Sequence, residues 1–532
     1  MCFGKWRTWA SPLALAVCVL AAGNARSADR EDCTALAARS ARSTITARVI
    51  EESDAPGAPG RPGVRLPAYC RVTGMVRPVA GSQIGFEVWL PLSGAWTGRM
   101  QMFGNGGYSS DLPLGQMAQG LARGSVVVAT DTGHTGDDPD FAVGHKQAIA
   151  DWGYRAVHET LVEAKRLTAR LYGRRTAYAY FNGCSTGGHQ ALMEAQRFPA
   201  DFDGIIAGAP GADRVRLNAA FLWQFLSNHR PGDNLHPILG PQDLALLQRA
   251  SFLSCHESNG GSAGGDRTDP WLDDPMQCRF DPATLACPRA GETQCLSQEQ
   301  VIAAQRMYTG ARDNRTGRIV TTPWLPGSEQ GWAAYWADPR NPTQPARANF
   351  WRVWAFEDPQ WDWWKFSYDR DLPAAMRKLD ALIDATDPDL RRYHRRGGKL
   401  LHYHGLADPV VSPLDSIRYF GQVEAAIGAR SLDDWYRLFL IPGMGHCAGG
   451  EGFWRFDPQS AIEAWVESGA PPRSIEAGGS AGQGTRLLCP YPARAVSALN
   501  GVSPQRYSCM APDAKRTEPR SSMQIADGRI TK

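Results

Sequence analysis

The chain has 532 residues, of which 43% are hydrophobic and 21% are charged. This composition is typical of a globular protein and excludes a largely disordered chain, which has fewer apolar residues and more net charge. The formal net charge is only +3, so no strong electrostatic field favours nucleic acid or an anionic membrane. A single core stops growing near about 250–300 residues, so the length predicts several domains or one domain with a large insertion.

The first 27 residues have the pattern of a secretory signal peptide. Lys5 and Arg7 supply positive charge, residues 12–22 form an apolar run, and Ala25 and Ser27 are small enough for a cleavage site. The alternative is a membrane anchor, but the run is far shorter than the roughly 20 residues that a spanning helix needs. We therefore expect a signal peptide at 1–27 and a mature protein that is secreted or periplasmic.

Twelve cysteines are present, and ten of them follow the expected signal peptide. This number is high for a protein of the reducing cytosol. No two cysteines have C-x-x-C spacing, which argues against a zinc ribbon or a thioredoxin-type site. We expect the ten cysteines to form five disulfides, whose pairing the spacing alone leaves open.

Strand and helix patterns alternate between about residues 85 and 210. The predicted strands are residues 85–90, 100–103, 125–130, 176–181 and 204–208. Residues 151–172 have helical spacing, and a second helix follows residue 185. This order predicts a parallel sheet with helices on both faces, which is an α/β fold.

The pattern stops near residue 211 and resumes with predicted strands at 399–403 and 436–441 and a helix at 461–468. The region between contains four of the ten later cysteines, and eight of the 18 tryptophans fall between Trp324 and Trp364. An insertion that leaves the sheet at a strand end lies where α/β sheets bind ligands. We therefore expect an α/β domain formed by 28–210 and 396–510, a lid domain at 211–395 and a polar tail at 511–532.

The G-x-S-x-G motif at residues 183–187 places Ser185 between a predicted strand and a predicted helix. Such a turn exposes the serine hydroxyl, and glycines tolerate its strained geometry. The N-terminus of the following helix directs backbone N–H groups toward developing negative charge. The pattern predicts a nucleophilic serine.

A nucleophilic serine needs a base and an orienting acid, which in this fold follow in the order serine, acid, histidine. Asp408 follows the predicted strand at 399–403, and His446 follows the predicted strand at 436–441. Both lie in loops at the carboxyl ends of strands. Four other histidines are rivals that we expect to be structural, because none follows the last core strand: His134, His189, His402 and His404.

The oxyanion hole should use the backbone N–H of Thr186 and a second N–H from a loop after an earlier strand. The glycine-rich loop at 104–107 follows such a strand, so Gly107 or Gly106 is the expected second donor, with an ordinary turn as the alternative. Cys184 precedes Ser185, and Cys447 follows His446. If the serine and the histidine are within hydrogen-bonding reach, these two cysteines are close enough to bond, unless each pairs elsewhere.

These stretches together resemble the tannase/feruloyl esterase family of secreted α/β-hydrolases. The matching segments are GAWTGR (94–99), GNGG (104–107), DTGH (131–134), GYRA (153–156), GCSTGG (183–188), AQRFP (195–199), DG (203–204), HGLADPVVSP (404–413) and GMGHC (443–447). The resemblance implies an α/β-hydrolase fold with a large inserted lid and a catalytic triad of Ser185, Asp408 and His446. It also implies the disulfides Cys184–Cys447, Cys33–Cys70, Cys255–Cys278, Cys287–Cys295 and Cys489–Cys509.

The resemblance implies a serine carboxylic-ester hydrolase that cleaves esters of feruloyl or galloyl type through an acyl-enzyme. Mono(2-hydroxyethyl) terephthalate hydrolases belong to the same family and are the alternative, although they typically have Glu where this chain has Thr186. A non-catalytic binding protein and a peptidase on the same fold are further alternatives. We expect lid aromatics to roof the acyl pocket, with Trp351, Trp354 and Phe356 as candidates.

No cofactor is expected for catalysis. The family's lid usually has a calcium loop after the cysteine that corresponds to Cys255, but here His256 occupies its first Asp position. Carboxylates that remain as possible calcium ligands are Asp266, Asp269, Asp273 and Asp274. We expect this site to be lost or rearranged rather than retained. The expected partner is a small aromatic ester, with neither nucleic acid nor a membrane.

Overall fold

The computed structural model describes residues 30–55, 63–92, 94–257, 269–289, 291–428, 432–480, 484–497 and 507–511. The expected signal peptide at 1–27 lies outside the described residues, as does all but the first residue of the expected tail at 511–532. Within the described part of the chain, no helix combines the length and the apolar character needed to cross a membrane.

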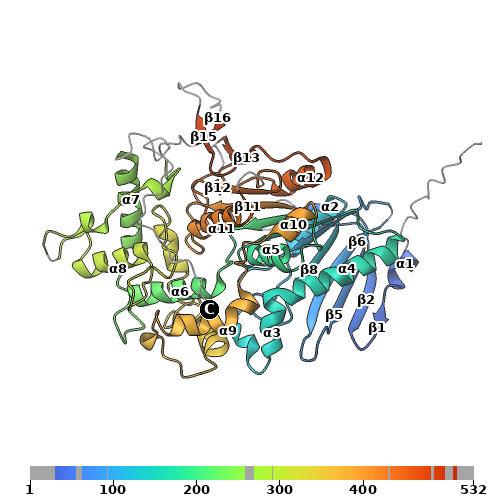
Figure 1. Ribbon diagram of the computed structural model, residues 1–532, viewed down its shortest axis with the longest axis horizontal. Coiled ribbons are helices and arrows are strands. Elements are labelled where there is room, and N and C mark those ends of the chain that lie inside the picture. Colours follow the sequence, from blue (N-terminus) through green and yellow to red (C-terminus); the bar gives the residue numbers. More distant parts are fainter. Residues whose placement is uncertain are drawn as a thin grey trace, which may run out of the picture.

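The centre of the molecule is a mixed sheet in which ten strands are described (Figure 1). Its strand order is β1-β2-β5-β6-β8-β7-β9-β10-β11-β12. The strands from β8 to β12 pair in parallel, whereas β1, β2, β5 and β6 pair antiparallel and extend the sheet at its N-terminal end. The bounds of these strands are β1 (Ala38–Arg39), β2 (Ser43–Ile50), β5 (Tyr69–Val76), β6 (Ile84–Pro91), β7 (Arg99–Phe103), β8 (Val126–Thr130), β9 (Tyr178–Cys184), β10 (Gly204–Gly208), β11 (Lys399–Gly405) and β12 (Tyr436–Ile441).

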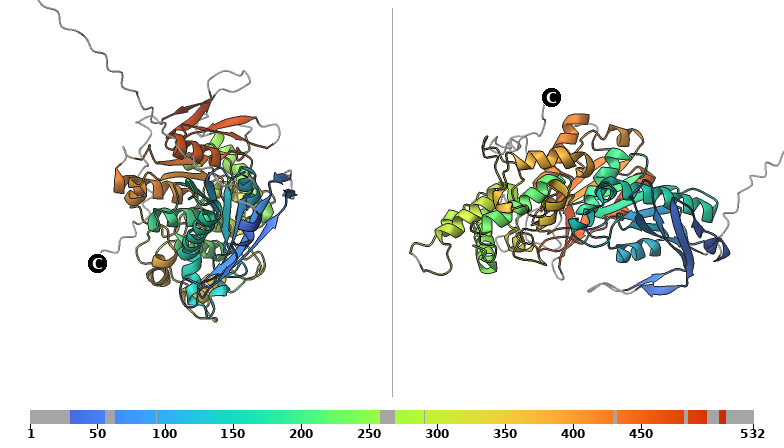
Figure 2. Two further views of the ribbon diagram at one scale, coloured as in Figure 1. Left: turned by 90° about the vertical axis from the view of Figure 1, so that its right-hand side faces the viewer. Right: turned by 90° about the horizontal axis from the view of Figure 1, so that it is seen from below.

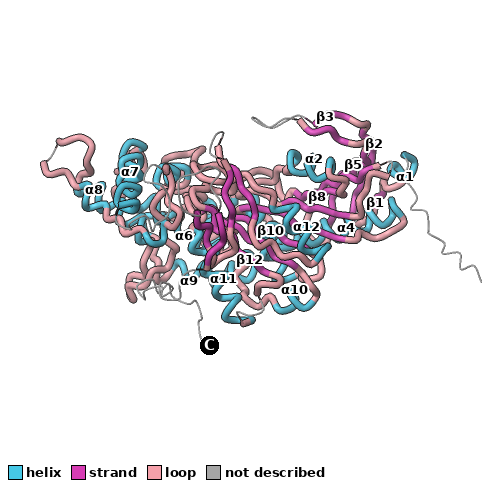
Figure 3. Tube along the Cα trace, turned by 90° about the horizontal axis from the view of Figure 1, so that it is seen from above, coloured by secondary structure: helices cyan, strands magenta, loops and turns pink. Residues whose placement is uncertain are grey.

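Helices cover both faces of the sheet (Figure 3), because its strands bury side chains on both sides. In β8, Val126 and Val128 belong to the apolar cluster on the face that α4 covers, whereas Val127 and Ala129 belong to the cluster that includes α2 on the opposite face. This alternation follows from the two-residue repeat of a strand. The α/β prediction is confirmed. The helices on the sheet are α2 (Leu114–Ala122), α4 (Ala156–Tyr172), α5 (Thr186–Arg197), α11 (Pro413–Ile427) and α12 (Pro458–Ser468).

Most of the chain between β10 and β11 forms a region of helices and long loops at one end of the molecule, opposite the N-terminal strands (Figures 1 and 2). Its aromatic core includes Trp351 and Trp354 and extends to Trp152 and Tyr108, which belong to the sheet-forming part of the chain. The predicted insertion at 211–395 falls within this region, and its role as a lid stays a prediction. The helices here are α6 (Arg214–Asn228), α7 (Pro241–Glu257), α8 (Gln298–Thr309) and α9 (Asp371–Ile383), whereas α10 (Arg391–Arg395) lies at the sheet beside α5.

The helix predicted at 151–172 is interrupted in the structure. The predicted range begins with a π-helical turn (Asp151–Arg155), which continues from α3 (Lys146–Ala150), and α4 forms the rest of it. A Cβ at Gly153 would lie 2.3 Å from the carbonyl oxygen of Leu382, so this turn packs its backbone directly against the end of α9. A wider turn of this kind is a local adjustment that hydrophobic spacing does not encode.

Five disulfides connect the described cysteines: Cys33–Cys70, Cys184–Cys447, Cys255–Cys278, Cys287–Cys295 and Cys489–Cys509. These are the pairs that the family resemblance implies. The remaining described α-helix and strands are α1 (Arg30–Thr34), β3 (Ser53–Ala55), β4 (Val64–Leu66), β13 (Ile475–Gly478), β14 (Thr485–Leu488), β15 (Arg494–Ser497) and β16 (Tyr507–Met510).

Candidate active site

Ser185 occupies a tight turn between β9 and α5, with φ of 63° and ψ of −118°. A non-glycine residue at positive φ is strained and persists only where its surroundings hold it. Glycines provide the space for this turn: a Cβ at Gly188 would lie 2.2 Å from the carbonyl oxygen of Gly208, and one at Gly183 would lie 2.5 Å from the Gly187 backbone. The G-x-S-x-G pattern thus forms the strand–turn–helix that it predicts.

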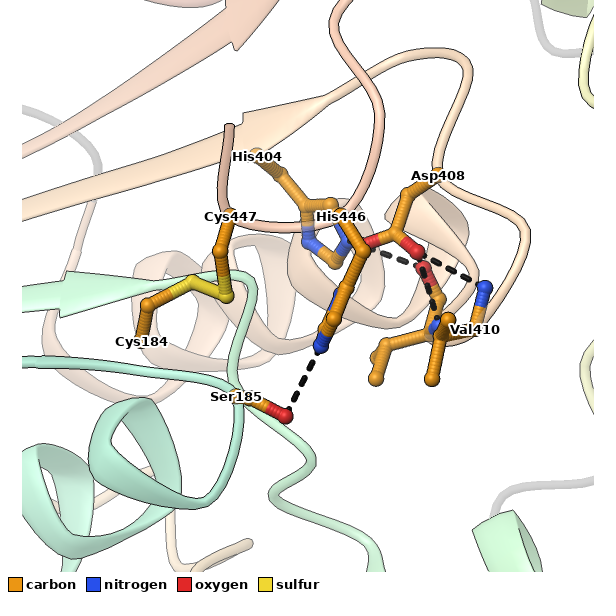
Figure 4. The surroundings of a disulfide bond; sticks show 8 residues. Cys184, Ser185, His404, Asp408, Val410, His446 and Cys447 are labelled. Carbon is orange, nitrogen blue, oxygen red and sulfur yellow. Dashed lines mark hydrogen bonds and ion pairs between the residues drawn. A yellow bond between two sulfur atoms is a disulfide. The ribbon is translucent and has the colours of Figure 1, made fainter. Parts of the chain in front are cut away.

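A continuous hydrogen-bonded chain joins Ser185, His446 and Asp408 (Figure 4). His446 Nε2 lies 2.8 Å from Ser185 Oγ, and His446 Nδ1 lies 2.7 Å from Asp408 Oδ2. A carboxylate oxygen accepts, so Nδ1 carries the proton and Nε2 is free to accept the serine proton. The three residues follow β9, β11 and β12, and the parallel order β9-β10-β11-β12 brings these strand ends to one edge of the sheet.

Asp408 is held by hydrogen bonds to both of its carboxylate oxygens. Oδ1 accepts from the backbone N–H groups of Val410 and Val411 at 2.8 and 3.0 Å, and Oδ2 also lies 3.1 Å from Nε2 of His404. Burial by itself raises the pKa of Asp408, but the charge of His446 and the hydrogen bonds from both histidines outweigh it and lower that pKa. Asp408 is therefore ionised throughout the neutral pH range.

The disulfide Cys184–Cys447 lies directly beside this chain of hydrogen bonds (Figure 4). Its Cα atoms are 5.8 Å apart. Cys447 has φ of 63°, which like that of Ser185 is uncommon for a non-glycine residue. The bond links the residue before the serine to the residue after the histidine.

The loop proposed to complete the oxyanion hole is tied to the first residue of α5. The Thr186 hydroxyl donates to the carbonyl oxygen of Gly107 at 2.7 Å, and Nη2 of Arg214 donates to the same hydroxyl oxygen at 3.0 Å. The backbone of Gly107 has φ of 55°, a conformation that favours glycine. Gly106 has open space beside it, because a Cβ there would have no atom within 4 Å. The structure thus brings Thr186 and the glycine loop together beside Ser185.

Arg214 is a site residue that the sequence did not indicate. It is buried at the start of α6, with its guanidinium 5.1 Å from the ring centroid of Trp152 and 5.9 Å from that of Tyr108. Burial lowers its pKa. No described carboxylate forms an ion pair with it, so it is a buried cation supported by aromatic faces and by Thr186. Nothing in the spacing along α6 distinguishes this arginine from a surface one.

The rival histidines have other partners. His134 Nε2 bonds the carbonyl oxygen of Tyr108 at 2.7 Å, and His189 Nε2 bonds that of Ile383 at 2.6 Å. His402 and His404 are fully buried on β11. His404 therefore lies on the strand rather than in the loop where the sequence placed it, and it contacts Asp408 directly.

The aromatic residues expected to roof an acyl pocket are mostly core residues. Trp351 and Trp354 have no exposed surface, and Phe356 is half-buried beside Trp351. Trp354 donates its indole N–H to the carbonyl oxygen of Pro139 and packs edge-on against Trp152. The expectation that Trp351 or Trp354 faces the serine is therefore wrong for this structure, since neither offers a surface to a ligand.

The residues considered for calcium are partly engaged elsewhere. His256 Nε2 lies 3.1 Å from the carbonyl oxygen of Trp271, Asp273 pairs with Arg486, and Asp274 pairs with Arg494. The considered residue Asp266 lies outside the described residues, and Asp269 has an interaction partner of its own. In the described ranges, no three His, Cys, Asp or Glu side chains gather as metal ligands would.

Comparison with known proteins adds evidence that is independent of this geometry. A model of the family "Tannase and feruloyl esterase" matches residues 70–510. A mono(2-hydroxyethyl) terephthalate hydrolase of Piscinibacter sakaiensis is 32% identical, with the alignment covering 84% of this chain and 85% of that protein. A probable feruloyl esterase B-1 of Aspergillus flavus is 30% identical, with coverage of 80% and 83%.

The solved structure of feruloyl esterase B from Aspergillus oryzae has a TM-score of 0.79 to this chain at 25% identity. The match covers 90% of this chain and all of that one. The family model spans more than half of the chain, and both relatives named above are aligned over most of their lengths. The chain therefore belongs to the tannase and feruloyl esterase family and is a carboxylic ester hydrolase with the α/β-hydrolase fold.

Proposed function

We propose that the protein is a serine esterase in which Ser185, His446 and Asp408 are the catalytic residues. The observation that carries this proposal is the unbroken chain from Ser185 Oγ through the imidazole to Asp408, with both distances below 3 Å. His446 Nε2 takes the serine proton while Oγ attacks the ester carbonyl carbon. Asp408 keeps Nδ1 protonated and stabilises the imidazolium that forms.

The reaction then proceeds through an acyl-enzyme. The tetrahedral oxyanion is bound by the backbone N–H of Thr186 and that of Gly107, or of Gly106 in the same loop. The protonated Nε2 of His446 next gives its proton to the leaving alcohol, and a water activated by the same nitrogen hydrolyses the acyl-enzyme. A single oxyanion donor contributes about 2.7–4 kcal/mol to such a step.

The proposed substrates are esters of aromatic acids of feruloyl or galloyl type. Family membership and the feruloyl esterase relatives support this class. A terephthalate half-ester is the alternative, because one relative is a mono(2-hydroxyethyl) terephthalate hydrolase, although Thr186 stands where Glu is expected. We also propose that the region between β10 and β11 acts as the lid and that catalysis needs no cofactor. The protein is proposed to be secreted or periplasmic, because five disulfides fit an oxidising compartment.

The test is hydrolysis of methyl ferulate, methyl gallate and terephthalate half-esters by the full protein and by Ser185→Ala. We expect Ser185→Ala to remove hydrolysis of every substrate that the unmodified protein cleaves, with an unchanged circular dichroism spectrum. A fluorophosphonate probe should label the unmodified protein only, which distinguishes an esterase from a non-catalytic protein of the same fold. Activity on a peptide bond but not on these esters would favour the peptidase. Retained ester hydrolysis in Ser185→Ala would contradict the proposal.

A further inference from the structure

A second line of hydrogen bonds reaches the triad acid at the same carboxylate oxygen that binds His446. It runs from the Tyr436 hydroxyl to His402, then to the Ser416 hydroxyl, then to His404 and finally to Asp408. Its heavy-atom distances are 2.9, 2.7, 2.6 and 3.1 Å in that order. Three separate elements supply it, since the two histidines lie on β11, the serine on α11 and the tyrosine on β12.

The chemistry of the acceptors fixes the tautomer of His404. Its Nε2 lies within hydrogen-bonding distance of Asp408 Oδ2 and, at 2.9 Å, of the Val411 carbonyl oxygen. Both atoms only accept, so Nε2 carries a proton. In the neutral imidazole Nδ1 must then accept, and its partner is the Ser416 hydroxyl.

The tautomer of His404 sets the direction of every hydrogen bond in the line. Ser416 donates to His404 and therefore accepts from Nε2 of His402, whose Nδ1 accepts from the Tyr436 hydroxyl. In the reverse direction His404 would be doubly protonated, and the tyrosine proton would have no acceptor among the described residues. Burial, with a smaller effect of His404, lowers the pKa of His402 well below its usual range, which agrees with a neutral ring.

We propose that His404 is a positioning residue of the esterase: held as the neutral Nε2–H tautomer by Ser416 and His402, it donates a second hydrogen bond to the Asp408 oxygen that binds His446. The proposal rests on the proposed function of the triad. Asp408 then receives two N–H groups on each carboxylate oxygen, which fixes the rotation of the carboxylate and so the direction in which His446 presents Nε2 to Ser185 (Figure 4).

Complete burial makes this arrangement costly to disturb. The side chains of His402, His404 and Asp408 are at most 1% exposed, and so is Ser416. A buried donor or acceptor without a partner loses its hydration with no compensation, so each member of the line is needed by the next. Because both histidines are neutral, the line supplies oriented dipoles to the triad acid without adding a charge that would compete with His446.

The other ionisable groups around His404 are few. Asp408 lies in the loop that follows β11, His402 lies two residues before His404 on β11, and Asp415 lies on α11. Asp415 is paired with Arg418 at 2.8 Å and accepts from the Thr322 hydroxyl. The nearby negative charges of Asp408 and Asp415 are thus both bound by other donors, so His404 need not be protonated to satisfy them.

The test compares His404→Leu, which removes the donor, with His404→Gln, whose amide N–H can replace Nε2–H. Fewer hydrogen bonds to Asp408 leave more of its negative charge for the His446 imidazolium. We therefore expect His404→Leu to move the acid limb of the kcat/KM profile to higher pH by about half to one unit and to reduce kcat about tenfold. His404→Gln should recover most of both effects.

A milder variant covers the case in which His404→Leu does not fold. Ser416→Ala breaks the line one step further away and should move the acid limb in the same direction by a smaller amount. Ser125→Ala is its matched control, because Ser125 is equally buried and bonds Gln101 at 3.1 Å far from the triad. It should lower thermal stability and leave the pH profile unchanged.

A readout without turnover separates this proposal from the esterase assignment. The Nδ1 proton of His446 can be followed by nuclear magnetic resonance as a function of pH in each variant. An unmodified protein that hydrolyses no aromatic ester would overturn the proposed function, and the resonance would still report the coupling of His404 to His446. Equal pH midpoints in the unmodified protein, His404→Leu and Ser416→Ala, or an equal shift in His404→Gln and His404→Leu, would overturn the positioning role.

Discussion

Removal of the disulfide Cys184–Cys447 should affect both stability and catalysis, and a control disulfide distinguishes the two effects. Cys184–Cys447 joins positions 263 residues apart in sequence, directly beside Ser185 and His446. In the chain-entropy model, removing a cross-link across a loop of this length lowers the free energy of unfolding by about 5.5 kcal/mol. The disulfide Cys287–Cys295 spans only 8 positions, for which the same model gives about 2.5 kcal/mol, and it provides the control.

We expect the double variant Cys184→Ala/Cys447→Ala to lose activity as well as stability. Without the bond, the loops after β9 and β12 are held together only by packing and by the hydrogen bond between Ser185 and His446. A misplacement of about 1 Å between nucleophile and base costs on the order of 100-fold in rate. A fall in kcat of about 10- to 100-fold is therefore expected, with a much smaller change in KM.

The assay is hydrolysis of methyl ferulate at a temperature well below the unfolding midpoint of every variant, with thermal unfolding measured in parallel. Cys287→Ala/Cys295→Ala should unfold at a lower temperature than the unmodified protein and keep its kcat. If the 184/447 variant unfolds earlier but retains full kcat, the sheet alone positions the two residues and the reasoning is wrong. An equal loss of kcat in both double variants would instead attribute the effect to general destabilisation.

Three further changes have outcomes set by single contacts. Thr186→Val removes the hydroxyl that binds the Gly107 carbonyl and should lower kcat about tenfold, whereas Thr186→Ser should keep it; similar rates for both would contradict a role of the hydroxyl. Gly188→Ala places a Cβ 2.2 Å from a backbone carbonyl oxygen and should prevent folding to an active enzyme. In the control Gly115→Ala the new Cβ has no atom within 4 Å, so urea unfolding should show a stabilisation of about 0.5–1 kcal/mol. Burial raises the pKa of Asp131 to about 6, so near pH 5 the folded state holds a proton that the unfolded state has released. The free energy of unfolding should therefore fall as the pH rises from about 4 to about 6. Asp131→Asn should remove roughly 2–3 kcal/mol of that fall, and identical pH dependence of unfolding in both proteins would refute it.

The sheet-forming strands and the three residues of the proposed triad could be predicted from the sequence because both depend on local patterns. The buried strand at 126–130 has an uninterrupted apolar run, and the turn at Ser185 has its glycines at fixed offsets. Asp408 and His446 were placed by their positions after predicted strands, which needs no knowledge of which strands are neighbours.

The supporting contacts of the site depend on tertiary packing and have no such local signal. His404 looks like any alternating strand residue, and its contact with Asp408 depends on how the loop after β11 turns back. Arg214 lies in a helix of ordinary pattern, yet its guanidinium bonds the Thr186 hydroxyl, 28 residues earlier in the chain. The prediction that Trp351 and Trp354 line the acyl pocket was wrong. A high density of tryptophan is equally typical of the hydrophobic core of an inserted region and of a ligand pocket.

The point at which the inserted region leaves the sheet limits how it can move. It begins after β10, between the strand that precedes Ser185 and the strand that precedes Asp408. There, the Ser185 N–H donates to the Gly208 carbonyl oxygen at 2.9 Å, and the Gly211 N–H donates to the Ser185 carbonyl oxygen at 3.2 Å. Because the first residues of the insertion are bonded to the backbone of Ser185, a movement of the insertion that displaced them would also displace the serine. If the insertion moves as the proposed lid, a movement that preserves the proposed triad must bend the chain beyond Gly211, so the backbone bonds at Ser185 and Gly211 hold the serine independently of the rest of the insertion.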